Sequence, residues 1–480
     1  MLWAAADRDP GGVWLRSDAG TLTFAAAAGQ VAGTAAALRA AGIGHGDRVL
    51  VTGRSTPPYL LCWLALTSMG AVAVYVNPAS SAAELAGLAA QTRPRALIAD
   101  EPGELGVPWL DIRELTGTSA ELRVEARPDD LATLIPTSGT TGRSKLVMQT
   151  HRAYALAGEG FPFWMGLTGE DRLMTSLPLF HINAPAYSVL GSLACGAGLI
   201  LLERFSASGF LDAARRHGAT EFNAIGAMLE ILMRRPELPD DADTPLRLCY
   251  TGPAPARERQ LEIEERFGLR IVVGYALSES PYGLIWPHGS RPYGTLGTVR
   301  QHPTLGTINH ARLDDGELLL RNPAITPGYW EMPEETAKAI TDDGWLRTGD
   351  LVTVDGNGVY TFVSRLKEVL RRRGENLSPL EVEEVLEAHP DVLECAVIGV
   401  PSNLSEEEVK AFIVPANGQP DFTELHAWAA AHLAPFKVPR FWQTVPSLPR
   451  TPTARVAKHL LPRDHPPGEY DAENPAVERD

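Results

Sequence analysis

The pattern of apolar and polar positions divides the chain into regions of different character. Through roughly the first 290 residues, short β-rich runs alternate with helical stretches rich in Ala, Leu and Arg. The runs at 47–51 and 271–275 each end at a turn, and ligands bind at the carboxyl ends of strands in sheets of this kind. The alternation predicts an α/β fold built on parallel sheets.

A second region, residues 293–362, has short strands separated by Gly, Asp and Pro turns, which predicts a small barrel or an antiparallel sheet. Beyond it the sequence predicts a smaller α+β region. Its expected elements are a helix at 379–389, a strand at 393–400 and a helix near 421–433. The final stretch, 465–480, is rich in Pro and acidic residues, which predicts disorder. A chain of 480 residues exceeds what one core normally serves, so we expect at least two domains.

Two apolar stretches, 60–76 and 187–202, approach the length that spans a membrane, but glycine interrupts each of them. We therefore expect buried helix–turn–strand units in a soluble protein with no membrane span. The sequence begins Met-Leu-Trp-Ala and lacks the basic and apolar run of a secretion signal.

The charge and cysteine content exclude several classes of partner. The formal net charge is −16, which argues against a nucleic-acid or anionic-membrane partner because both need a basic face. The four cysteines lie far apart with no CxxC pair, so neither a disulfide framework nor a zinc site is expected. This cysteine usage suits a reducing compartment, and we expect a cytoplasmic protein.

The strongest local signal is the segment 134–145, Leu-Ile-Pro-Thr-Ser-Gly-Thr-Thr-Gly-Arg-Ser-Lys. Its two glycines let the backbone approach an anion closely, while the four hydroxyls within 137–141 and the backbone N–H groups surround phosphate oxygens. It is not a Walker A loop, because the second Gly is not followed directly by Lys and Ser or Thr. The alternative interpretation of this segment alone is an ordinary Ser/Thr/Gly turn.

The segment resembles the phosphate loop of the ANL superfamily, the acyl-CoA ligases and adenylation domains. These enzymes convert a carboxylate and ATP to an acyl-adenylate and then pass the acyl group to a thiol. Further motifs resemble those of the family in the same order. They are Leu-Pro-Leu-Phe-His (177–181), Tyr-Thr-Gly-Pro-Ala (250–254), Gly-Tyr-Ala-Leu-Ser-Glu (274–279), Gly-Trp-Leu-Arg-Thr-Gly-Asp (344–350), Arg-Leu-Lys (365–367) and Gly-Glu-Asn-Leu-Ser-Pro (374–379). The chain is identified as a member of the acyl-CoA ligase branch.

The resemblance implies a particular domain organisation. A large N-terminal domain, residues 1–364, contains two αβ sheets and a small β-barrel-like subdomain. A hinge at 365–367 leads to a small mobile α+β C-terminal domain, residues 368–480, which ends in the disordered tail. In the family the small domain rotates between the two half-reactions, and Lys367 occupies the hinge position.

Residue types at the motif positions suit nucleotide binding. Tyr275 offers a flat face for adenine, and the Ser278 hydroxyl can bond the α-phosphate. Glu279 is a hard oxygen ligand suited to Mg²⁺. Asp350 can accept both ribose hydroxyls, unless it is only a turn residue, and Arg365 supplies donors for ribose or phosphate. The resemblance implies that nucleotide or phosphate is bound by Thr137, Ser138, Gly139, Thr140, Thr141, Gly142, Lys145, Gly252, Pro253, Ala254, Tyr275, Ser278, Asp350 and Arg365.

The resemblance also implies an acyl pocket and a thiol channel. The pocket residues are Phe180, His181, Ala184, Ala224, Gly226, Ala227 and Gly274. The segments around the pocket are rich in small residues, which favours a bulky apolar acid of secondary metabolism, although helix packing also selects Ala and Gly. These small residues are Ala184, Ala186, Ala224, Gly226, Ala227, Gly252 and Ala254. His181 alone could be a core histidine. After rotation, the CoA channel is expected to be lined by Gly374, Glu375 and Asn376. The basic run 371–373 before them either meets CoA phosphates or is a solvated surface run.

One motif departs from the family. The C-terminal signature Pro-x-Gly-Lys has a Lys that bridges the carboxylate and the α-phosphate, but here Ala454 and Arg455 replace Gly and Lys. A planar guanidinium does not replace a compact ammonium in such a slot. We expect adenylation to be weakened or lost and thioester formation to be spared, with a separate adenylating enzyme supplying the acyl-AMP. The alternative is that Arg455 or Lys458 substitutes adequately.

The expected catalytic set is His181, Lys367, Arg455 and Glu279, acting on a carboxylic acid or its acyl-adenylate with ATP or acyl-AMP, CoA and Mg²⁺. Three functions stay open from the sequence. The first is an acyl-CoA ligase, with or without its own adenylation step. The second is a freestanding adenylation enzyme that loads a carrier protein, and the third is a non-catalytic nucleotide-binding protein.

Overall fold

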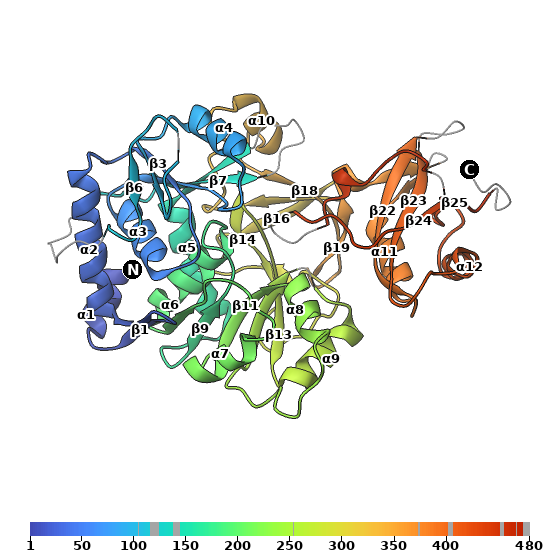
Figure 1. Cartoon of the computed structure of the whole chain (residues 1–480), viewed down its shortest axis with the longest axis horizontal. Helices are drawn as coiled ribbons and strands as arrows, with labels where there is room; N and C mark the ends of the chain where they lie inside the picture. The colour runs from blue at the N-terminus through green and yellow to red at the C-terminus, as the bar shows by residue number, and fades with distance from the viewer. Residues whose placement is uncertain are drawn as a thin grey trace. The chain divides into compact units, whose positions relative to one another are not determined.

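The computed structural model describes residues 1–103, 105–115, 124–137, 145–252, 254–372, 375–401, 407–451, 456–466 and 468–473. The chain divides into two compact units (Figure 1). The larger unit comprises Met1–Arg312, Leu319–Thr348 and Val354–Tyr360, and the smaller comprises Leu313–Leu318, Gly349–Thr353 and Thr361–Asp480. The expected boundaries at the hinge, 365–367, stay a prediction.

A nine-stranded sheet dominates the larger unit, in the order β15-β14-β13-β12-β11-β9-β10-β1-β2. Its strands are β1 (Val13–Ser17), β2 (Gly20–Thr23), β9 (Arg172–Thr175), β10 (Gly198–Leu201), β11 (Glu221–Ile225), β12 (Leu248–Gly252), β13 (Arg270–Leu277), β14 (Ser280–Ile285) and β15 (Thr298–Val299). Neighbouring strands along the run β13-β12-β11-β9-β10-β1 are parallel, whereas β2, β14 and β15 pair antiparallel with their neighbours.

The second sheet of this unit has the order β6-β5-β3-β4-β7-β8. Its strands are β3 (Arg48–Val51), β4 (Val72–Tyr75), β5 (Ala96–Ala99), β6 (Trp109–Asp111), β7 (Leu131–Thr137) and β8 (Lys145–Thr150). All pairs are parallel except β7 with β8. Two sheets of mainly parallel strands confirm the α/β expectation.

Helices cover and separate these sheets, and one buried cluster joins side chains of both (Figure 1). The helices are α1 (Leu2–Arg8), α2 (Phe24–Ala40), α3 (Pro57–Ser68), α4 (Ala82–Thr92), α5 (His151–Met165), the π-helix η1 (Ala184–Val189), α6 (Leu190–Cys195), α7 (Phe210–His217), α8 (Gly226–Met233), α9 (Arg257–Phe267) and α10 (Pro333–Ala339). In α4 a capping box between Ser81 and Glu84 satisfies the first N–H groups.

The two long apolar stretches form the helix–turn–strand units expected of them. The first becomes α3 and β4, with Gly70 at a positive φ of 74° between them. The second becomes η1, α6 and β10, with Gly196 at 77°. Among the described residues, no helix is both long and apolar enough to cross a membrane.

The short strands expected between 293 and 362 include a four-stranded sheet in the order β16-β17-β18-β19. These are β16 (His310–Asp314), β17 (Glu317–Arg321), β18 (Leu346–Val354) and β19 (Tyr360–Arg365).

The C-terminal part of the smaller unit has its own hydrophobic clusters. Its strands are β20 (Leu370–Arg372), β21 (Glu375–Leu377), β22 (Val392–Pro401), β23 (Glu407–Pro415), β24 (Phe441–Thr444) and β25 (Tyr470–Asp471). Its helices are α11 (Pro379–Glu387) and α12 (Phe422–His432), with 3-10 turns η2 (Leu366–Glu368) and η3 (Lys458–Leu460).

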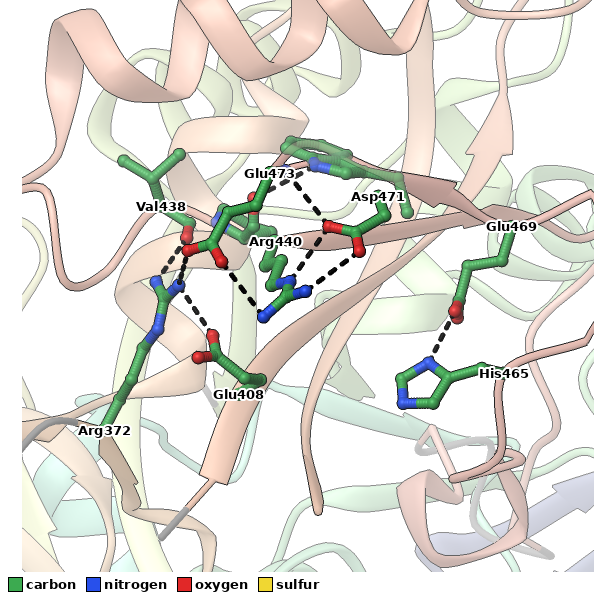
Figure 2. A network of polar contacts seen from close by, with 10 residues as sticks. Arg372, Glu408, Val438, Arg440, His465, Glu469, Asp471 and Glu473 are labelled. Atoms are coloured by element: carbon green, nitrogen blue, oxygen red, sulfur yellow. Dashed lines mark hydrogen bonds and ion pairs between the residues drawn. The ribbon is translucent and has the colours of Figure 1, made fainter. Parts of the chain in front are cut away.

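The end of the chain departs from the disorder that its composition predicts. β25 pairs antiparallel with β24, and ion pairs fix Glu469, Asp471 and Glu473 (Figure 2). Acidic side chains that signal disorder in isolation here meet buried Lys410 and half-buried Arg440, and Tyr470–Asp471 form a strand of the sheet. Residues 474–480 lie outside the described part of the chain.

Candidate active site

A two-residue turn between β13 and β14 presents the first pair of candidate residues. Leu277 pairs with Ser280, so Ser278 and Glu279 form the turn itself. The Ser278 carbonyl accepts a hydrogen bond from the side-chain amide of buried Gln149. The Glu279 carbonyl accepts from the Thr326 N–H at 2.7 Å. The turn is therefore held from two sides through its own backbone carbonyls.

Tyr329 connects this turn to the end of the phosphate loop. Its hydroxyl donates to Glu279 Oε1 at 2.9 Å. Lys145, the first residue of β8, places its Nζ 5.0 Å from the centre of the Tyr329 ring. The same ammonium lies 2.5 Å from Glu335 Oε2 on α10. A chain of contacts thus runs from Glu335 through Lys145 and Tyr329 to Glu279.

The protonation states in this chain follow from its environment. Burial raises the pKa of Tyr329, and the neighbouring Glu279 carboxylate raises it further, so the hydroxyl keeps its proton and donates. Hydrogen bonds from Lys145 and then Lys338 lower the pKa of Glu335 to about 2. At neutral pH, therefore, a carboxylate at 335 balances the ammonium of Lys145.

The donor set at Glu279 fits Mg²⁺ held jointly with a nucleotide. No cluster of three potential metal-binding side chains occurs in the described part of the chain. Mg²⁺ is commonly bound by one or two carboxylates together with substrate phosphates and water, so Glu279 is sufficient on the protein side. When bound there, the ion would neutralise charge on the phosphates.

The segment expected beside the acyl group leads into the π-helix η1. The rings of Phe180 and His181 lie 4.6 Å apart between centroids, and both residues are half-buried. Asn223 on β11 donates its amide to Asn183 Oδ1 at 2.7 Å, which ties this segment to the large sheet. Ala184 begins η1 and is fully buried. π-helical turns often mark functional sites.

The small residues of the expected pocket differ in what surrounds them. A Cβ at Gly274 would lie 2.5 Å from the Tyr250 ring, and one at Gly252 would lie 2.5 Å from the Gly274 carbonyl oxygen. These two glycines permit close packing, so they do not themselves indicate pocket volume. At Gly226, the first residue of α8, no heavy atom of the described residues comes within 4 Å of the Cβ position, apart from the chain neighbours and the helix's own backbone. Ala224 is buried on β11, and Ala227 is half-buried on α8.

Asp350 and Arg365 meet within the smaller unit. Asp350 on β18 is 3% exposed, and its Oδ1 lies 3.4 Å from Arg365 Nε at the end of β19. One residue earlier, the Gly349 N–H donates to Glu317 Oε1 at 2.9 Å. The structure thus brings together the carboxylate and the guanidinium of the two motifs, and their roles toward ribose and phosphate stay predictions.

The basic run 371–373 lies on and after β20, and Arg372 is not a surface residue. Its side chain is 4% exposed and lies 2.6 Å from Glu408 Oε2 (Figure 2). Arg372 Nη1 also donates to the Val438 carbonyl at 2.8 Å. β20 pairs with β21 in the register Arg372 with Glu375. Arg372 therefore anchors the hairpin that leads into the expected thiol-channel loop, and neither predicted role fits it.

Several predicted residues lie outside the described part of the chain: Ser138, Gly139, Thr140, Thr141, Gly142, Pro253, Gly374 and Arg455. The side chains of Lys367, Glu375 and Asn376 lie outside it as well.

Thr137 ends β7, where its hydroxyl donates to the Lys145 carbonyl at 3.3 Å. Tyr275 lies on β13, and half-buried Ala254 packs against the main core. The roles of all these residues stay predictions.

Sequence reasoning missed three residues that support the site. Gln149, Tyr329 and Glu335 contact predicted site residues, yet they lie outside the quoted motifs. The available signal was the run Gly-Tyr-Trp at 328–330, in which two large aromatic residues follow a glycine among turn residues.

The mixed two-sheet domain, the Ser278–Glu279 turn and the Asp350–Arg365 pair fit the class of adenylate-forming acid–thiol ligases. The chain belongs to the AMP-binding enzyme family, whose profile matches residues 2–330, and the profile of the AMP-binding enzyme C-terminal domain matches residues 381–455.

Among its relatives is the crotonobetaine/carnitine–CoA ligase of Salmonella heidelberg (strain SL476), 30% identical over 88% of this chain and 89% of the relative. The ATP-bound MatB of Rhodopseudomonas palustris has a TM-score of 0.86 at 26% identity, covering 96% of this chain and 97% of its own. The o-succinylbenzoate CoA synthetase of Bacillus subtilis, in complex with its acyl-adenylate, has a TM-score of 0.86 at 25% identity with the same coverage.

Proposed function

We propose that this acid–thiol ligase makes a thioester from an acyl-adenylate and CoA, and that its own adenylation step is weak or lost. The observation that carries the proposal is Arg455, which stands where the family has Lys. Adenylation must align two mutually repelling anions, and a rigid guanidinium fork aligns them less well than an ammonium does. A separate adenylating enzyme then supplies the acyl-AMP.

Thioester formation does not need that alignment. The thiol sulfur attacks the acyl carbon, a C–S bond forms, and the bond from that carbon to the phosphate oxygen breaks. AMP leaves with the electron pair, and the thiol proton is released. In the proposal, His181 and the loop 374–376 line the thiol channel during this step, and the residue at 455 takes no part.

An ordinary two-step ligase is the second candidate, and a specific observation favours it. The contacts of Lys145, Tyr329 and Glu279 fix the relative positions of the cation and the carboxylate that the motifs assign to phosphate and metal. Such a site serves adenylation, since thiol attack on a finished acyl-adenylate needs no pyrophosphate-binding machinery. In this case Arg455 or Lys458 performs the work of the family's Lys.

For the substrate we propose a bulky apolar carboxylic acid of secondary metabolism, handled in the cytoplasm. Open space at Gly226 and the small side chains of Ala224 and Ala227 support this choice. Gly252 and Gly274 do not indicate pocket volume, because neighbouring atoms occupy the space beside them.

The test separates the half-reactions with a panel of bulky and small acids. One arm follows acid-dependent exchange between ATP and pyrophosphate, and the other supplies presynthesised acyl-adenylates with CoA. Thioester formation without exchange supports the proposal, whereas brisk exchange and thioester from ATP and free acid establish the two-step ligase. Exchange followed by transfer only to a carrier protein's phosphopantetheine, and not to CoA, would establish a freestanding adenylation enzyme.

A further inference from the structure

The backbone around Tyr329 is fixed on both sides. Residues 328–330 extend the edge of β8, because Met148 N donates to the Gly328 carbonyl at 3.1 Å and Trp330 N donates to the Leu146 carbonyl at 2.9 Å. The Tyr329 N–H itself donates to Thr336 Oγ1 at 2.9 Å. Gly328 has φ of 138°, and a Cβ there would lie 2.4 Å from Thr336, so glycine is required. The Tyr329 ring therefore projects from a rigid support.

The side chain of Tyr329 contacts two charged groups of opposite sign. Its ring face receives the Lys145 ammonium at 5.0 Å, and its hydroxyl holds Glu279 Oε1 at 2.9 Å. Tyr329 is only 8% exposed, so its own ring and hydroxyl are largely shielded from water. A rigid aromatic ring with only two torsions thus sets the separation between a cation for phosphates and a carboxylate for metal.

We propose that Tyr329 is a positioning residue for the metal–phosphate site: its hydroxyl orients the Glu279 carboxylate toward Mg²⁺, and its ring seats Lys145 for nucleotide phosphates. This inference rests on the proposed use of the site for nucleotide. Mg²⁺ demands near-ideal octahedral geometry, so a carboxylate that is free to rotate binds it less well. Partners that orient a metal-binding side chain are typically worth about 10- to 100-fold in metal affinity.

The variant Tyr329→Phe tests the hydroxyl alone, because it keeps the ring and therefore the Lys145 contact. Binding of a non-hydrolysable ATP analogue is measured by calorimetry over a range of Mg²⁺ concentrations and also without metal. The expected result is a Mg²⁺ requirement raised about 10-fold or more, with metal-free affinity for the analogue unchanged. Tyr329→Leu also removes the ring and is expected to weaken metal-free binding as well.

Two controls separate positioning from general structure. Tyr75→Phe removes another buried hydroxyl, which bonds to Tyr154 at 3.1 Å, and should leave the Mg²⁺ requirement unchanged. In a Glu279→Gln background, Tyr329→Phe should have no further effect on the Mg²⁺ requirement, because the group that it orients is already altered. Additive effects of the two changes would contradict the inference.

A second measurement on the same variants separates the role of Tyr329 from the proposed function. Thioester formation from a presynthesised acyl-adenylate is measured on the same variants as a separate readout of the second half-reaction. Loss of that activity together with equal losses of metal-free and Mg²⁺-dependent binding overturns positioning in favour of a folding role. If the unmodified protein binds the analogue equally well with and without Mg²⁺, the inference fails even if thioester formation succeeds. A shifted Mg²⁺ requirement without thioester activity supports the inference and overturns the proposed function.

Discussion

Arg372 and Glu408 form a buried ion pair in the smaller unit, with 2.6 Å between Nη2 and Oε2 and side chains 4% and 3% exposed (Figure 2). Glu473 lies 3.8 Å from the same guanidinium, and Arg440 bridges Asp471 and Glu473. Buried charges of this kind are tolerated only when every partner is present. The hairpin β20–β21 is therefore tied to β23 and to the end of the chain.

Replacing Arg372 with Met should destabilise the smaller unit by about 3–5 kcal/mol, because Glu408 would be left buried without its cation. Hydrogen exchange in β22, β23 and β24 should accelerate, while exchange in the nine-stranded sheet should change little. The matched control is Lys437→Met, which breaks the more exposed pair with Glu381 and should cost about 0.2–1 kcal/mol. Equal effects of the two substitutions would show that burial of the Arg372 pair is unimportant.

The variant Arg455→Lys should raise the rate of acid-dependent ATP–pyrophosphate exchange by at least tenfold, because it restores a compact ammonium between the carboxylate and the α-phosphate. Thioester formation from supplied acyl-adenylate should stay the same. Lys458→Ala in the unmodified protein is the companion measurement. A collapse of exchange in that variant, with no gain from Arg455→Lys, would show that Lys458 performs the role.

Removing the charge of Glu335 should strengthen nucleotide binding. In the variant Glu335→Gln the Lys145 ammonium loses the carboxylate that lies 2.5 Å away and becomes fully available to phosphates. Because this pair is partly exposed, we expect a gain in affinity for metal-free ATP of about two- to fivefold. Calorimetric titration checks this, with the exposed neighbour Glu334→Gln as control. Weaker binding in Glu335→Gln would mean that Glu335 orders Lys145 and does not compete with phosphate.

Two glycine substitutions should separate packing from pocket volume. Gly274→Ala should lower the melting temperature, because the added methyl overlaps the Tyr250 ring, whose hydroxyl accepts a 2.6 Å hydrogen bond from buried Arg300. Overpacking of this kind costs about 1–3 kcal/mol. Gly226→Ala should leave the melting temperature unchanged and shift the preference of the enzyme toward smaller acids. An unchanged acid preference in Gly226→Ala would remove position 226 from the pocket.

Glu221 should make stability fall as pH rises. Burial raises its pKa well above the ordinary value of 4.5, and Asp171 adds to this, while neither carboxylate oxygen has a hydrogen-bond partner among the described residues. Because the folded state holds the proton more tightly, the contribution to stability is complete below about pH 4.5 and is lost as pH rises toward the folded pKa.

Glu221→Gln should therefore become increasingly more stable than the parent between pH 5 and 8, by up to about 1.4 kcal/mol per pH unit. Melting temperatures of both proteins across this range provide the measurement, and the exposed Glu258→Gln is the control. A constant difference across the range would mean that Glu221 does not titrate differently in the folded state.

The sequence predicted the turn residues Ser278 and Glu279 because they lie in one continuous motif. It could not predict Tyr329, since the contact with Glu279 joins positions 50 residues apart and depends on how residues 328–330 pair with β8. The sequence could not tell which small residues line a pocket. Gly226 faces open space, whereas the Tyr250 ring packs closely against Gly274. Composition alone does not distinguish these cases, because glycine is compatible with both surroundings.

The segment that contains β25 affects when the smaller unit can finish folding during synthesis. Lys410 is fully buried, and its ammonium lies 2.6 Å from Glu469, while Arg440 depends on Asp471 and Glu473. During synthesis these cations are in place long before residues 469–473 leave the ribosome. Domains generally fold as units from the N-terminal side, so the two-sheet unit can fold early. The smaller unit keeps these charges unneutralised until residues 469–473 have emerged, so its folding is completed only after that segment is synthesised.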